Sequence, residues 1–428
     1  MSTQTNGNKK KILIVGGGFA GLNFAYQLFK NDDYEVTLID KNNYNYFTPL
    51  LYQVATSFLE PSSISYPFRK LFRKKNINFR MGEVQKVDPA ARQLYLKDGA
   101  LLPYDHLVFA AGAATNFYGI ENVRKNAISL KGIDDAIVMR NALMKTMELA
   151  AQTTDPVERK KLLTIVVAGG GPTGVEVVGM LAEMKNYIVG RDYPELKGAE
   201  GKIYIVDGGA NLLSPMSDKT HKETYDVVTR LGVEVKLNTQ VTDFSNDQVK
   251  FKNGEIIGTK TLIWAAGIIA HTFEGIPAES VGPGKRMITD EFNKVKGLEN
   301  IYAIGDISIQ FTDPVYPKGH PQLAQVAIQQ GRTLAKNFIA IHKGRPKKPF
   351  LYFDRGDMAI VGRHGAVVDL FKHRLHLSGF LALFIWLFIH LISLVNYNNK
   401  FKTFYNWAVA YMTRDQALRM IFRDNQRV

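Results

Sequence analysis

Two glycine clusters are the residues whose types and spacing most clearly predict chemistry, and the first follows the apolar run Lys11–Val15. Gly16, Gly18 and Gly21 lie between a strand pattern and a helical pattern, and the next apolar run ends at Asp40. In such a unit the first glycine permits a tight turn, the second lets the backbone approach a pyrophosphate, and the third lets helix and strand pack closely. The carboxylate can bind ribose hydroxyls. We therefore predict a dinucleotide site rather than a helix-capping turn with a surface aspartate.

The same arrangement recurs in the middle of the chain. After Leu162–Ala168, the residues Gly169, Gly171 and Gly174 repeat the spacing, and the following strand pattern ends at Asp207. No arginine lies nearby in the sequence, and a carboxylate at this position repels the 2′-phosphate of NADPH. The chain is thus predicted to have two dinucleotide sites, of which the second favours NADH.

Further segments place small residues at the ends of apolar runs. Leu107–Thr115 and Leu262–Ala270 have the alanine and glycine content expected where a chain crosses close to a bound cofactor. Asn300–Asp306 has a strand pattern that ends in Gly-Asp, and a helical stretch is expected to start at Pro321. A segment distant in sequence is therefore expected to complete the first nucleotide domain.

The elements that position these sites belong to a well-cored globular protein of two or three domains. The chain has 428 residues, of which 46% are hydrophobic, and this excludes disorder, collagen-like repeats and polytopic membrane folds. It has no cysteine, which excludes disulfides, thiolate metal sites, iron–sulfur clusters and thiol redox cycles. Any chemistry must use cofactors or oxygen and nitrogen groups, and no metal site is predicted.

Positive charge is concentrated near the C-terminus. The formal net charge is +14, and residues 343–428 contain 14 Lys and Arg against 5 Asp. Within them, Leu375–Asn399 has no Asp, Glu, Lys or Arg and is rich in aromatic residues, with Arg374 and Lys400 at its ends. Basic flanks around an apolar run favour an anionic membrane over nucleic acid as the partner.

This apolar run is expected to lie in the plane of a membrane rather than to cross it. It is long enough to span a bilayer core, but it contains polar residues such as His376 and His390. A second helical pattern follows, with apolar residues at spacings of three and four among basic ones, which is typical of an interfacial helix. Its members are Phe401, Phe404, Tyr405, Ala408, Tyr411 and Met412, with Lys402, Arg414, Arg419 and Arg423 among them.

Four stretches together resemble one family of flavoproteins. They are YFTPLLYQVATSFLEPSSI at 46–64, GGGPTGVEVVG at 169–179, AQVAIQQG at 324–331, and the aromatic, basic tail. Two dinucleotide fingerprints with a C-terminal Gly-Asp strand resemble the two-dinucleotide-binding-domain flavoproteins, and the four stretches are similar to the type II NADH:quinone oxidoreductases among them. The absence of cysteine excludes the sulfide:quinone and disulfide reductases on this scaffold, which work through cysteines.

The resemblance implies a fold and an activity. The fold would be α/β, with two Rossmann-like dinucleotide-binding domains and a C-terminal helical membrane-anchoring region. Residues 9–115 and 290–345 would form an FAD domain, 116–289 an NADH domain and 350–428 the membrane-associating region, after a basic linker at 343–349. A hydride would pass from NADH to FAD, and two electrons would pass on to a respiratory quinone without proton pumping.

The resemblance also implies roles for particular side chains. Gln325 and Gln329 share a helical face and would hydrogen-bond the quinone, whereas without the resemblance such a pair is typical of a solvent-exposed face. Glu176 would orient NADH or assist quinone protonation. The alternative is that Glu176 is only a carboxylate in the first turn of a helix, where the helix dipole stabilises its negative charge. His390 would either pack in the apolar region or approach the quinone channel, and Glu183 would be structural.

The other expected site residues would contact the cofactors. Asp306 would hydrogen-bond the ribityl or phosphate part of FAD, and the helix expected from Pro321 would point its N-terminal amides at the flavin. Phe47, within Tyr46–Pro49, would line the flavin or pack in the core. The expected cofactor-binding set is Gly16, Gly18, Gly21, Asp40, Thr48, Pro49, Val84, Ala111, Gly112, Gly169, Gly171, Gly174, Asp207, Ala266, Gly267, Gly305, Asp306 and Ala324.

The expected electron acceptor is a membrane quinone, either menaquinone or ubiquinone, and a homodimer is compatible with the resemblance. The polar N-terminus MSTQTNGNKKK has no cleavable signal, so we expect a peripheral, monotopic protein on the cytoplasmic face of the membrane. Two other functions stay open. One is an NADH-dependent reductase with a soluble acceptor or oxygen, and the other is an NADH-binding protein that signals redox state.

Overall fold

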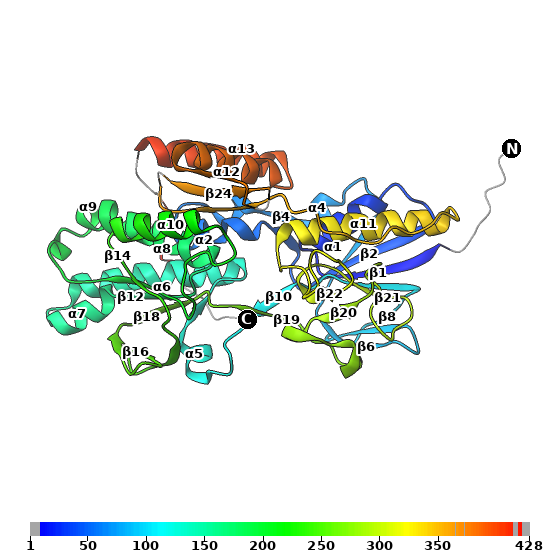
Figure 1. Cartoon of the computed structure of the whole chain (residues 1–428), viewed down its shortest axis with the longest axis horizontal. Helices are drawn as coiled ribbons and strands as arrows, with labels where there is room; N and C mark the ends of the chain where they lie inside the picture. The colour runs from blue at the N-terminus through cyan, green and yellow to red at the C-terminus, as the bar shows by residue number, and fades with distance from the viewer. Residues whose placement is uncertain (1–8, 364, 372, 414–417, 422–428) are drawn as a thin grey trace. The chain divides into compact units, whose positions relative to one another are not determined.

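The computed structural model describes residues 9–363, 365–371, 373–413 and 418–421 (Figure 1). The chain forms two compact units, each built around a five-stranded parallel sheet, which confirms the predicted α/β class. Unit 1 comprises Met1–Tyr46, Tyr66–Ala114 and Ile268–Phe353, and unit 2 comprises Phe47–Ser65, Thr115–Gly267 and Asp354–Val428.

The sheet of unit 1 takes its strands from distant parts of the chain. In spatial order they are β21 (Ile301–Ala303), β9 (His106–Phe109), β1 (Lys10–Val15), β2 (Tyr34–Asp40) and β5 (Ile77–Met81). The central strands are nearly continuous apolar runs because helices and loops cover both faces of a parallel sheet. Strand β21 pairs with β9, so a segment distant in sequence completes this sheet.

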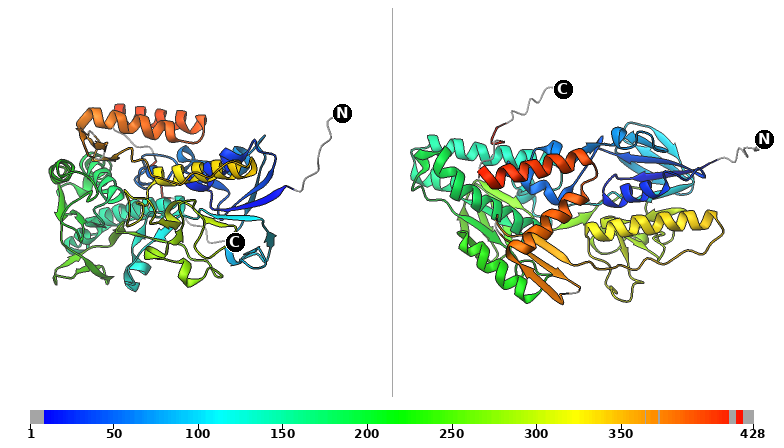
Figure 2. Two further views of the ribbon diagram at one scale, coloured as in Figure 1. Left: turned by 45° about the vertical axis from the view of Figure 1, so that its right-hand side comes forward. Right: turned by 90° about the horizontal axis from the view of Figure 1, so that it is seen from above.

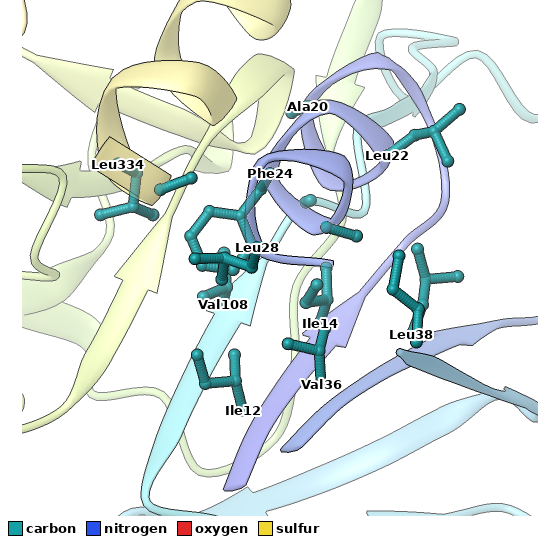
Figure 3. Close-up of a cluster of buried hydrophobic side chains, with 14 of the residues drawn as sticks. Ile12, Ile14, Ala20, Leu22, Phe24, Leu28, Val36, Leu38, Val108 and Leu334 are labelled. Atoms are coloured by element: carbon teal, nitrogen blue, oxygen red, sulfur yellow. The ribbon is translucent and has the colours of Figure 1, made fainter. Parts of the chain in front are cut away.

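Two helices cover one face of this sheet, α1 (Phe19–Leu28) and α11 (Ala324–His342). Figure 3 shows Phe24 of α1 within the cluster that strands β1, β2 and β9 form with α11. Its ring meets Phe338 of α11 edge-on, with 5.4 Å between the ring centroids. Truncating a fully buried ring to alanine typically costs about 3–5 kcal/mol. This core therefore fixes the helix that begins directly after the first glycine turn.

Smaller elements complete unit 1. They include the antiparallel sheet β6 (Val84–Asp88), β7 (Gln93–Leu96) and β8 (Leu101–Pro103), the parallel pair β20 (Met287–Thr289) and β22 (Ser308–Gln310), and the short helix α4 (Phe68–Leu71).

The sheet of unit 2 has a similar layout. Its strands, in spatial order, are β11 (Ile128–Ser129), β18 (Thr261–Trp264), β12 (Ile165–Ala168), β13 (Ile203–Val206) and β14 (Val233–Lys236). Helices of this part of unit 2 include α5 (Glu121–Asn126), α6 (Ile133–Gln152), α7 (Pro156–Leu163), α8 (Pro172–Met184) and α10 (Asp218–Arg230). A separate antiparallel sheet contains β15 (Val241–Ser245), β16 (Gln248–Phe251) and β17 (Ile256–Gly258). Both glycine turns thus follow an inner strand, β1 or β12, at the sheet edge where α/β proteins bind nucleotides.

The C-terminal region is an integral part of unit 2. It contains the antiparallel strands β23 (Asp357–Ile360), β24 (Ala366–Leu370) and β25 (Leu375–Ser378), followed by helices α12 (Gly379–Ser393) and α13 (Tyr397–Thr413) (Figure 2). Strand β23 packs against α8. At this contact, a Cβ atom on Gly179 of α8 would lie 2.6 Å from the backbone nitrogen of Gly362.

The segment Phe47–Ser65 is the third part of unit 2. It contains the short helices α2 (Leu51–Ala55) and α3 (Pro61–Ile64). Helix α2 packs against α6 and α8, and α3 packs against α13. Asn399 of α13 donates side-chain hydrogen bonds to the carbonyl oxygens of Ser63 and Ser65, at 2.9 and 3.0 Å, which fixes α13 on this segment.

Some expected boundaries differ from the structure. The apolar run 375–399 begins as strand β25, because its first residues pair with β24. The helix expected from Pro321 begins at Ala324, because Leu323 is extended with φ −122° and ψ 148°. In the run Leu162–Ala168 only the last four residues form strand β12, since the first two end helix α7.

The compact units also divide the chain differently from the expected domains. Residues 268–289 lie in unit 1 rather than with residues 116–267, and Phe47–Ser65 lies in unit 2. The C-terminal region joins unit 2 because β23, β24 and α13 pack on α8, α10 and α3 of that unit, respectively. Arg414 and Arg423, expected on an interfacial helix, are outside the described residues.

Candidate functional site

The first glycine turn, in unit 1, has the geometry of a pyrophosphate cradle. Gly16 has φ +104°, and a Cβ atom there would overlap the carbonyl oxygen of Ala110. A Cβ atom on Gly21 would overlap the carbonyl oxygen of Gly16, so glycine is required where α1 crosses the turn. Apart from Gly18 and its two chain neighbours, no atom of the described residues lies within 4 Å of a Cβ atom built on Gly18, the residue that precedes the N-terminus of α1. The open side of the turn thus leaves room for an anionic group at a helix N-terminus.

Asp40 at the end of β2 holds this turn in place. Its Oδ2 accepts a hydrogen bond from the backbone N–H of Gly17 at 2.7 Å, and its Oδ1 accepts one from Asn42 at 2.8 Å. Burial raises the pKa of Asp40, and the two backbone N–H groups partly offset that effect. A carboxylate has about four acceptor positions, so positions remain for the ribose hydroxyls of a bound dinucleotide.

The second glycine turn, in unit 2, repeats this geometry closely. Gly169 has φ +115°, and a Cβ atom there would overlap the carbonyl oxygen of Ala265. A Cβ atom on Gly174 would overlap the carbonyl oxygen of Gly169, as one on Gly21 would overlap that of Gly16. Within the part of the chain that the structure describes, only Gly171 and its two chain neighbours have atoms within 4 Å of a Cβ atom built on Gly171. Both turns therefore meet the steric requirement for a bound pyrophosphate.

Asp207 has the position in unit 2 that Asp40 has in unit 1. Its Oδ2 accepts a hydrogen bond from Gly170 at 2.5 Å, and its Oδ1 accepts one from Gly209 at 2.6 Å. A polar cavity of about 310 Å³ lies beside Asp207. One of its lining residues, Thr239, donates its backbone N–H to the carbonyl oxygen of Asp207 at 2.8 Å. The cavity is lined by Asn238, Thr239, Gln240, Lys252 and Asn253.

The Gly305–Asp306 turn, at the end of β21, is fixed by side chains that the sequence did not single out. Gln330 is buried in α11, and its Oε1 accepts a hydrogen bond from the N–H of Gly305 at 2.6 Å. Gln322 donates from Nε2 to the carbonyl oxygen of Asp306 at 2.8 Å. Gly331 lies so close to α1 that a Cβ atom would overlap the carbonyl oxygen of Ala20. These contacts place the N-terminus of α11 beside the turn.

Gln329 uses its amide differently from the expectation. Its Nε2 donates to the carbonyl oxygen of Phe353 at 2.9 Å, and its Oε1 accepts from the N–H of Phe353 at 3.1 Å. The side chain therefore holds the segment at Phe353 to α11. Gln325 lies one turn earlier on the same helix, and Ala324 is the first residue of that helix.

Glu176 is buried in unit 2, in the second turn of α8 rather than the first. Burial raises the pKa of its carboxyl well above the ordinary value, and a hydrogen bond from the N–H of Ile360 only partly opposes this effect. Here burial outweighs the helix dipole, so the neutral acid is favoured rather than the carboxylate that the dipole alone would stabilise. A neutral buried acid can give a proton to a neighbouring acceptor. Glu183, on the same helix, accepts from the N–H of Arg363 at 3.3 Å.

Sequence reasoning missed a buried hydrogen-bonded chain in unit 2. Trp407 of α13 donates from Nε1 to Oε1 of Gln53 at 2.8 Å, and Gln53 donates from Nε2 to the hydroxyl of Tyr52 at 3.0 Å. All three side chains are buried, and the charge of Glu176 contributes to raising the pKa of Tyr52, after burial itself. The only signal in the sequence is that Tyr52 and Gln53 lie within the stretch that carries the resemblance.

His390 is a packing residue in this structure. Its ring stacks on Trp386 at 3.7 Å between centroids and meets Phe47 edge-on at 6.0 Å. Its Nδ1 lies 2.8 Å from the carbonyl oxygen of Trp386. Burial lowers the pKa of His390 to about 4, so the ring is neutral at pH 7. Phe47 is correspondingly buried.

The remaining expected cofactor residues fall into two groups. Ala111, Gly112, Gly305 and Asp306 follow the carboxyl ends of β9 and β21 in unit 1, and Val84 begins β6 and packs on the core of the same unit. Ala266 and Gly267 follow β18 in unit 2, where the hydroxyl of Tyr118 donates to the carbonyl oxygen of Ala266 at 3.1 Å. Thr48 and Pro49 also lie in unit 2, in the short 3-10 helix Thr48–Leu50, and their contact with the flavin stays a prediction.

Helices α12 and α13 expose an unusual amount of apolar surface. Phe380, Phe384 and Phe388 of α12 are 78%, 61% and 56% exposed, and Phe401 and Met412 of α13 are 73% and 85% exposed. Trp386 and Trp407, in contrast, are buried where the two helices meet. Among the helices of the described residues, none is both long and apolar enough to cross a membrane.

Two units that each contain a glycine turn closed by a strand-end acid are typical of the pyridine nucleotide-disulphide oxidoreductases. The model of that family matches residues 10–331 of this chain. Two type II NADH:quinone oxidoreductases of Mycobacterium tuberculosis, NdhA and Ndh, are 34% and 31% identical to the chain. Each similarity covers 95% of this chain, with 88% of NdhA and 89% of Ndh. The solved structure of NDH2 from Plasmodium falciparum in complex with NADH superposes with a TM-score of 0.88 at 25% identity, over 97% of this chain and 100% of that one. This chain therefore belongs to the type II NADH:quinone oxidoreductases, as the sequence motifs indicated.

Proposed function

We propose that this chain oxidises NADH and reduces a membrane quinone, with FAD held by the first glycine turn and NADH by the second. The observation that carries this assignment is the duplicated turn, in which Gly16 and Gly169 have φ +104° and +115° and each turn is closed by a strand-end acid. FAD held there would supply the redox chemistry, hydride acceptance followed by two-electron transfer, so the protein itself needs no redox side chain.

In unit 1, side chains and backbone amides of this chain would position and polarise the flavin cofactor. We expect Asp40 to bind its ribose and the open face at Gly18 to accept its pyrophosphate. The turn at Gly305 and Asp306, fixed by Gln330, lies beside the N-terminus of α11. Amide groups at a helix N-terminus stabilise negative charge, which favours the reduced flavin.

In unit 2, Asp207 selects the nucleotide. Its carboxylate would accept hydrogen bonds from ribose hydroxyls and repel a 2′-phosphate. Lys252 lines the neighbouring cavity, and its positive charge would weaken the repulsion between Asp207 and a 2′-phosphate. A preference for NADH therefore requires the Asp207 carboxylate to lie closer to the ribose than the Lys252 ammonium group does.

For the acceptor half of the reaction we assign Glu176 and Gln325. Glu176 is a buried acid whose pKa is raised by burial, which favours the protonated form that could give a proton to a quinone oxygen that has gained electrons. Gln325 would hydrogen-bond the quinone carbonyl. The side-chain amide of Gln329 is hydrogen-bonded to the backbone of Phe353 and would hold the segment around Phe353 in place. A quinone that contacts Gln329 would have to share the amide nitrogen or oxygen with Phe353.

Membrane attachment is assigned to α12 and α13. Their exposed phenylalanines would enter the acyl boundary, while Arg374, Lys400 and Lys402 would meet anionic headgroups. We assign the attached face to the cytoplasmic side, and protease access to the C-terminus in oriented membrane vesicles tests that assignment. Light scattering of the purified protein tests the expected homodimer.

Steady-state turnover with different acceptors tests the proposed activity. Oxidation of NADH by the purified yellow protein should depend on an added menaquinone or ubiquinone analogue. Equal turnover with oxygen or a soluble acceptor alone would favour a soluble-acceptor reductase. A flavin that NADH bleaches and that quinone does not reoxidise would favour a redox sensor.

A further inference from the structure

We propose that Arg286 is a positioning residue for the flavin site, because its guanidinium joins the turn that carries Asp306 to the loop that leads into helix α11. A buried pair, Asp313 and His320, fixes the same loop. The inference rests on the function proposed above, in which FAD lies in unit 1 beside this turn and the N-terminus of α11. All of these residues belong to unit 1.

The guanidinium of Arg286 donates hydrogen bonds to two backbone segments. Its Nε donates to the carbonyl oxygen of Ser308 at 2.7 Å, and its Nη2 donates to the carbonyl oxygen of His320 at 3.0 Å. Ser308 begins β22 directly after the 3-10 turn Gly305–Ile307, and His320 lies shortly before Ala324, the first residue of α11. A guanidinium carries its N–H donors in a planar fork, so one side chain can hold both carbonyl groups in a fixed relation.

The Ser308 end of this bridge is part of the Asp306 turn. The hydroxyl of Ser308 donates to the carbonyl oxygen of Gly305 at 3.0 Å, and the amide oxygen of Gln330 accepts from the N–H of Gly305 at 2.6 Å. Helix α11 packs against this turn. Burial lowers the pKa of Arg286, and the charge of Asp306 opposes that effect, so the two charged groups attract each other. A displaced guanidinium would therefore disturb the turn as well as the loop.

The His320 end of the bridge is held by a buried carboxylate. Asp313 and His320 are each 1% exposed, and Nε2 of His320 lies 2.9 Å from Oδ2 of Asp313. Asp313 also accepts hydrogen bonds from the N–H of Val315 at 2.9 Å and from the N–H of Tyr352 at 3.0 Å. Burial would raise the pKa of Asp313, but these hydrogen bonds outweigh burial and lower it, so the group is a carboxylate at neutral pH. The loop is thus closed on itself, and Arg286 ties this closed loop to the turn.

Two elements that the cofactor is expected to contact are thereby fixed together. We expect Asp306 at the ribityl or phosphate part of FAD and the N-terminal amides of α11 at the flavin. The field of a helix terminus falls off within one turn, so a small shift of α11 relative to Asp306 would weaken both contacts. Gln322 also joins the loop to the turn, since its Nε2 donates to the carbonyl oxygen of Asp306 at 2.8 Å. Loss of Arg286 should therefore loosen the flavin site without abolishing it.

The rate at which the purified holoenzyme releases FAD measures this role without catalysis. Arg286→Gln should release FAD roughly tenfold faster than the wild-type protein, as followed by the fluorescence of the free cofactor after dilution. Lys285→Gln is the matched control, because Lys285 is the exposed neighbour of Arg286 and its substitution removes the same charge from the same segment. Release of FAD from Arg286→Gln at the wild-type rate would overturn the inference.

The midpoint potential of the flavin separates positioning from a purely structural role. Displaced helix amides should weaken the binding of the reduced flavin more than that of the oxidised flavin, so Arg286→Gln should lower the potential. A tenfold preferential loss corresponds to about 30 mV for a two-electron couple. Arg286→Lys keeps the charge but loses the planar fork, so it should shift the potential and the release rate in the same direction by less. Wild-type values in Arg286→Lys would show that charge alone matters and would contradict the positioning role.

Hydrogen exchange of the purified protein tests the bridge independently of the flavin. Amide exchange in peptides covering 311–323 should be roughly tenfold faster in Arg286→Gln, because the loop loses a donor at His320. Peptides covering α10, in unit 2, serve as the internal reference. Unchanged exchange in the loop would overturn the inference, and Arg286→Lys decides by the same three measurements if Arg286→Gln does not fold. If the purified protein holds no FAD, the proposed function fails, whereas the exchange result still decides whether Arg286 holds the loop.

Discussion

Asp207 carries the expected nucleotide preference at the scale of a single residue. Its carboxylate accepts two backbone hydrogen bonds within the turn, so Asp207→Asn, which keeps an acceptor oxygen, disturbs the turn less than alanine would. Loss of charge-assisted hydrogen bonds to the ribose should lower kcat/KM for NADH by roughly 10- to 100-fold and reduce the discrimination against NADPH. Steady-state kinetics with both nucleotides measure this.

The matched control for Asp207 is Asp40, which closes the equivalent turn in unit 1. Asp40→Asn should reduce the FAD content of the purified protein and leave the nicotinamide preference unchanged. Equal kcat/KM values for NADH and NADPH in the wild-type enzyme would contradict the assigned role of Asp207. Loss of FAD from Asp207→Asn would mean that the cofactors had been assigned to the wrong units.

The two glutamines of α11 should behave differently from one another. Gln325→Ala should slow reoxidation by quinone roughly two- to tenfold and leave flavin reduction by NADH unchanged. Gln329→Ala should also lower the melting temperature, because both backbone groups of Phe353 lose their side-chain partner. Stopped-flow kinetics and calorimetry on both variants separate these effects. A Gln329→Ala protein with wild-type stability would show that this pairing contributes little.

At the scale of elements, a buried carboxylate of strand β24 links strand β25 with the N-terminal end of helix α10. Asp369 accepts hydrogen bonds from the N–H of Ser217 at 2.7 Å and the hydroxyl of Thr220 at 2.9 Å, and it lies 2.8 Å from Nδ1 of His376. Nε2 of His376 lies 3.0 Å from Glu223 of α10. Burial alone would lower the pKa of His376, but hydrogen bonds with Asp369 and Glu223 outweigh burial and raise it.

This contact predicts a pH-dependent stability. The raised pKa means that the folded state binds the His376 proton more tightly than the unfolded state, whose pKa is about 6.5. The contribution is therefore fully present below about pH 6.5 and is lost as the pH rises through the folded-state pKa. Urea unfolding at pH 6 and pH 9 should show that His376→Gln destabilises the protein more at pH 6. An equal loss at both pH values would contradict the ion pair.

Helices α12 and α13 should bind a membrane through their exposed aromatic residues. The double substitution Phe384→Ser and Phe388→Ser should lower partitioning into phosphatidylglycerol vesicles by at least about tenfold, because each buried phenylalanine contributes about 1.5–3 kcal/mol. Val157→Ser is the control, since Val157 is 64% exposed on α7. Vesicle sedimentation measures the partitioning, and undiminished binding of the double variant would contradict the assignment. Deleting residues 350–428 is a poorer test, because it would uncover α8 and Glu176.

Local chemistry explains which of these elements the sequence could predict. The glycine turns and their strand-end acids depend on residues close together in sequence, so the sequence could place Gly16 and Gly169 in the turns and Asp40 and Asp207 at the strand ends beside them. The boundaries of helices were harder to predict. Ala324 rather than Pro321 begins α11 because Leu323 is extended, and nothing local to that stretch forbids an earlier start.

At the scale of the whole molecule, the unpredicted part of the site depends on residues far apart in the chain. Trp407 reaches Gln53 across 354 positions, and Asp369 reaches Ser217 across 152. No spacing rule links such residues, because only the packing of the C-terminal region on unit 2 brings them together. The C-terminal region therefore has one observed role and one proposed role: its strand β23 packs on α8, which carries Glu176, and its helices α12 and α13 are proposed to attach to a membrane.

Anaerobic stopped-flow measurement of one complete cycle tests the central claim most directly. The oxidised yellow protein is mixed with one equivalent of NADH, and the reduced protein is then mixed with a menaquinone or ubiquinone analogue. We predict that NADH bleaches the flavin absorbance and that quinone restores it fully, without oxygen. A flavin that stays reduced in the presence of quinone, and that only oxygen or a soluble acceptor reoxidises, would contradict the account.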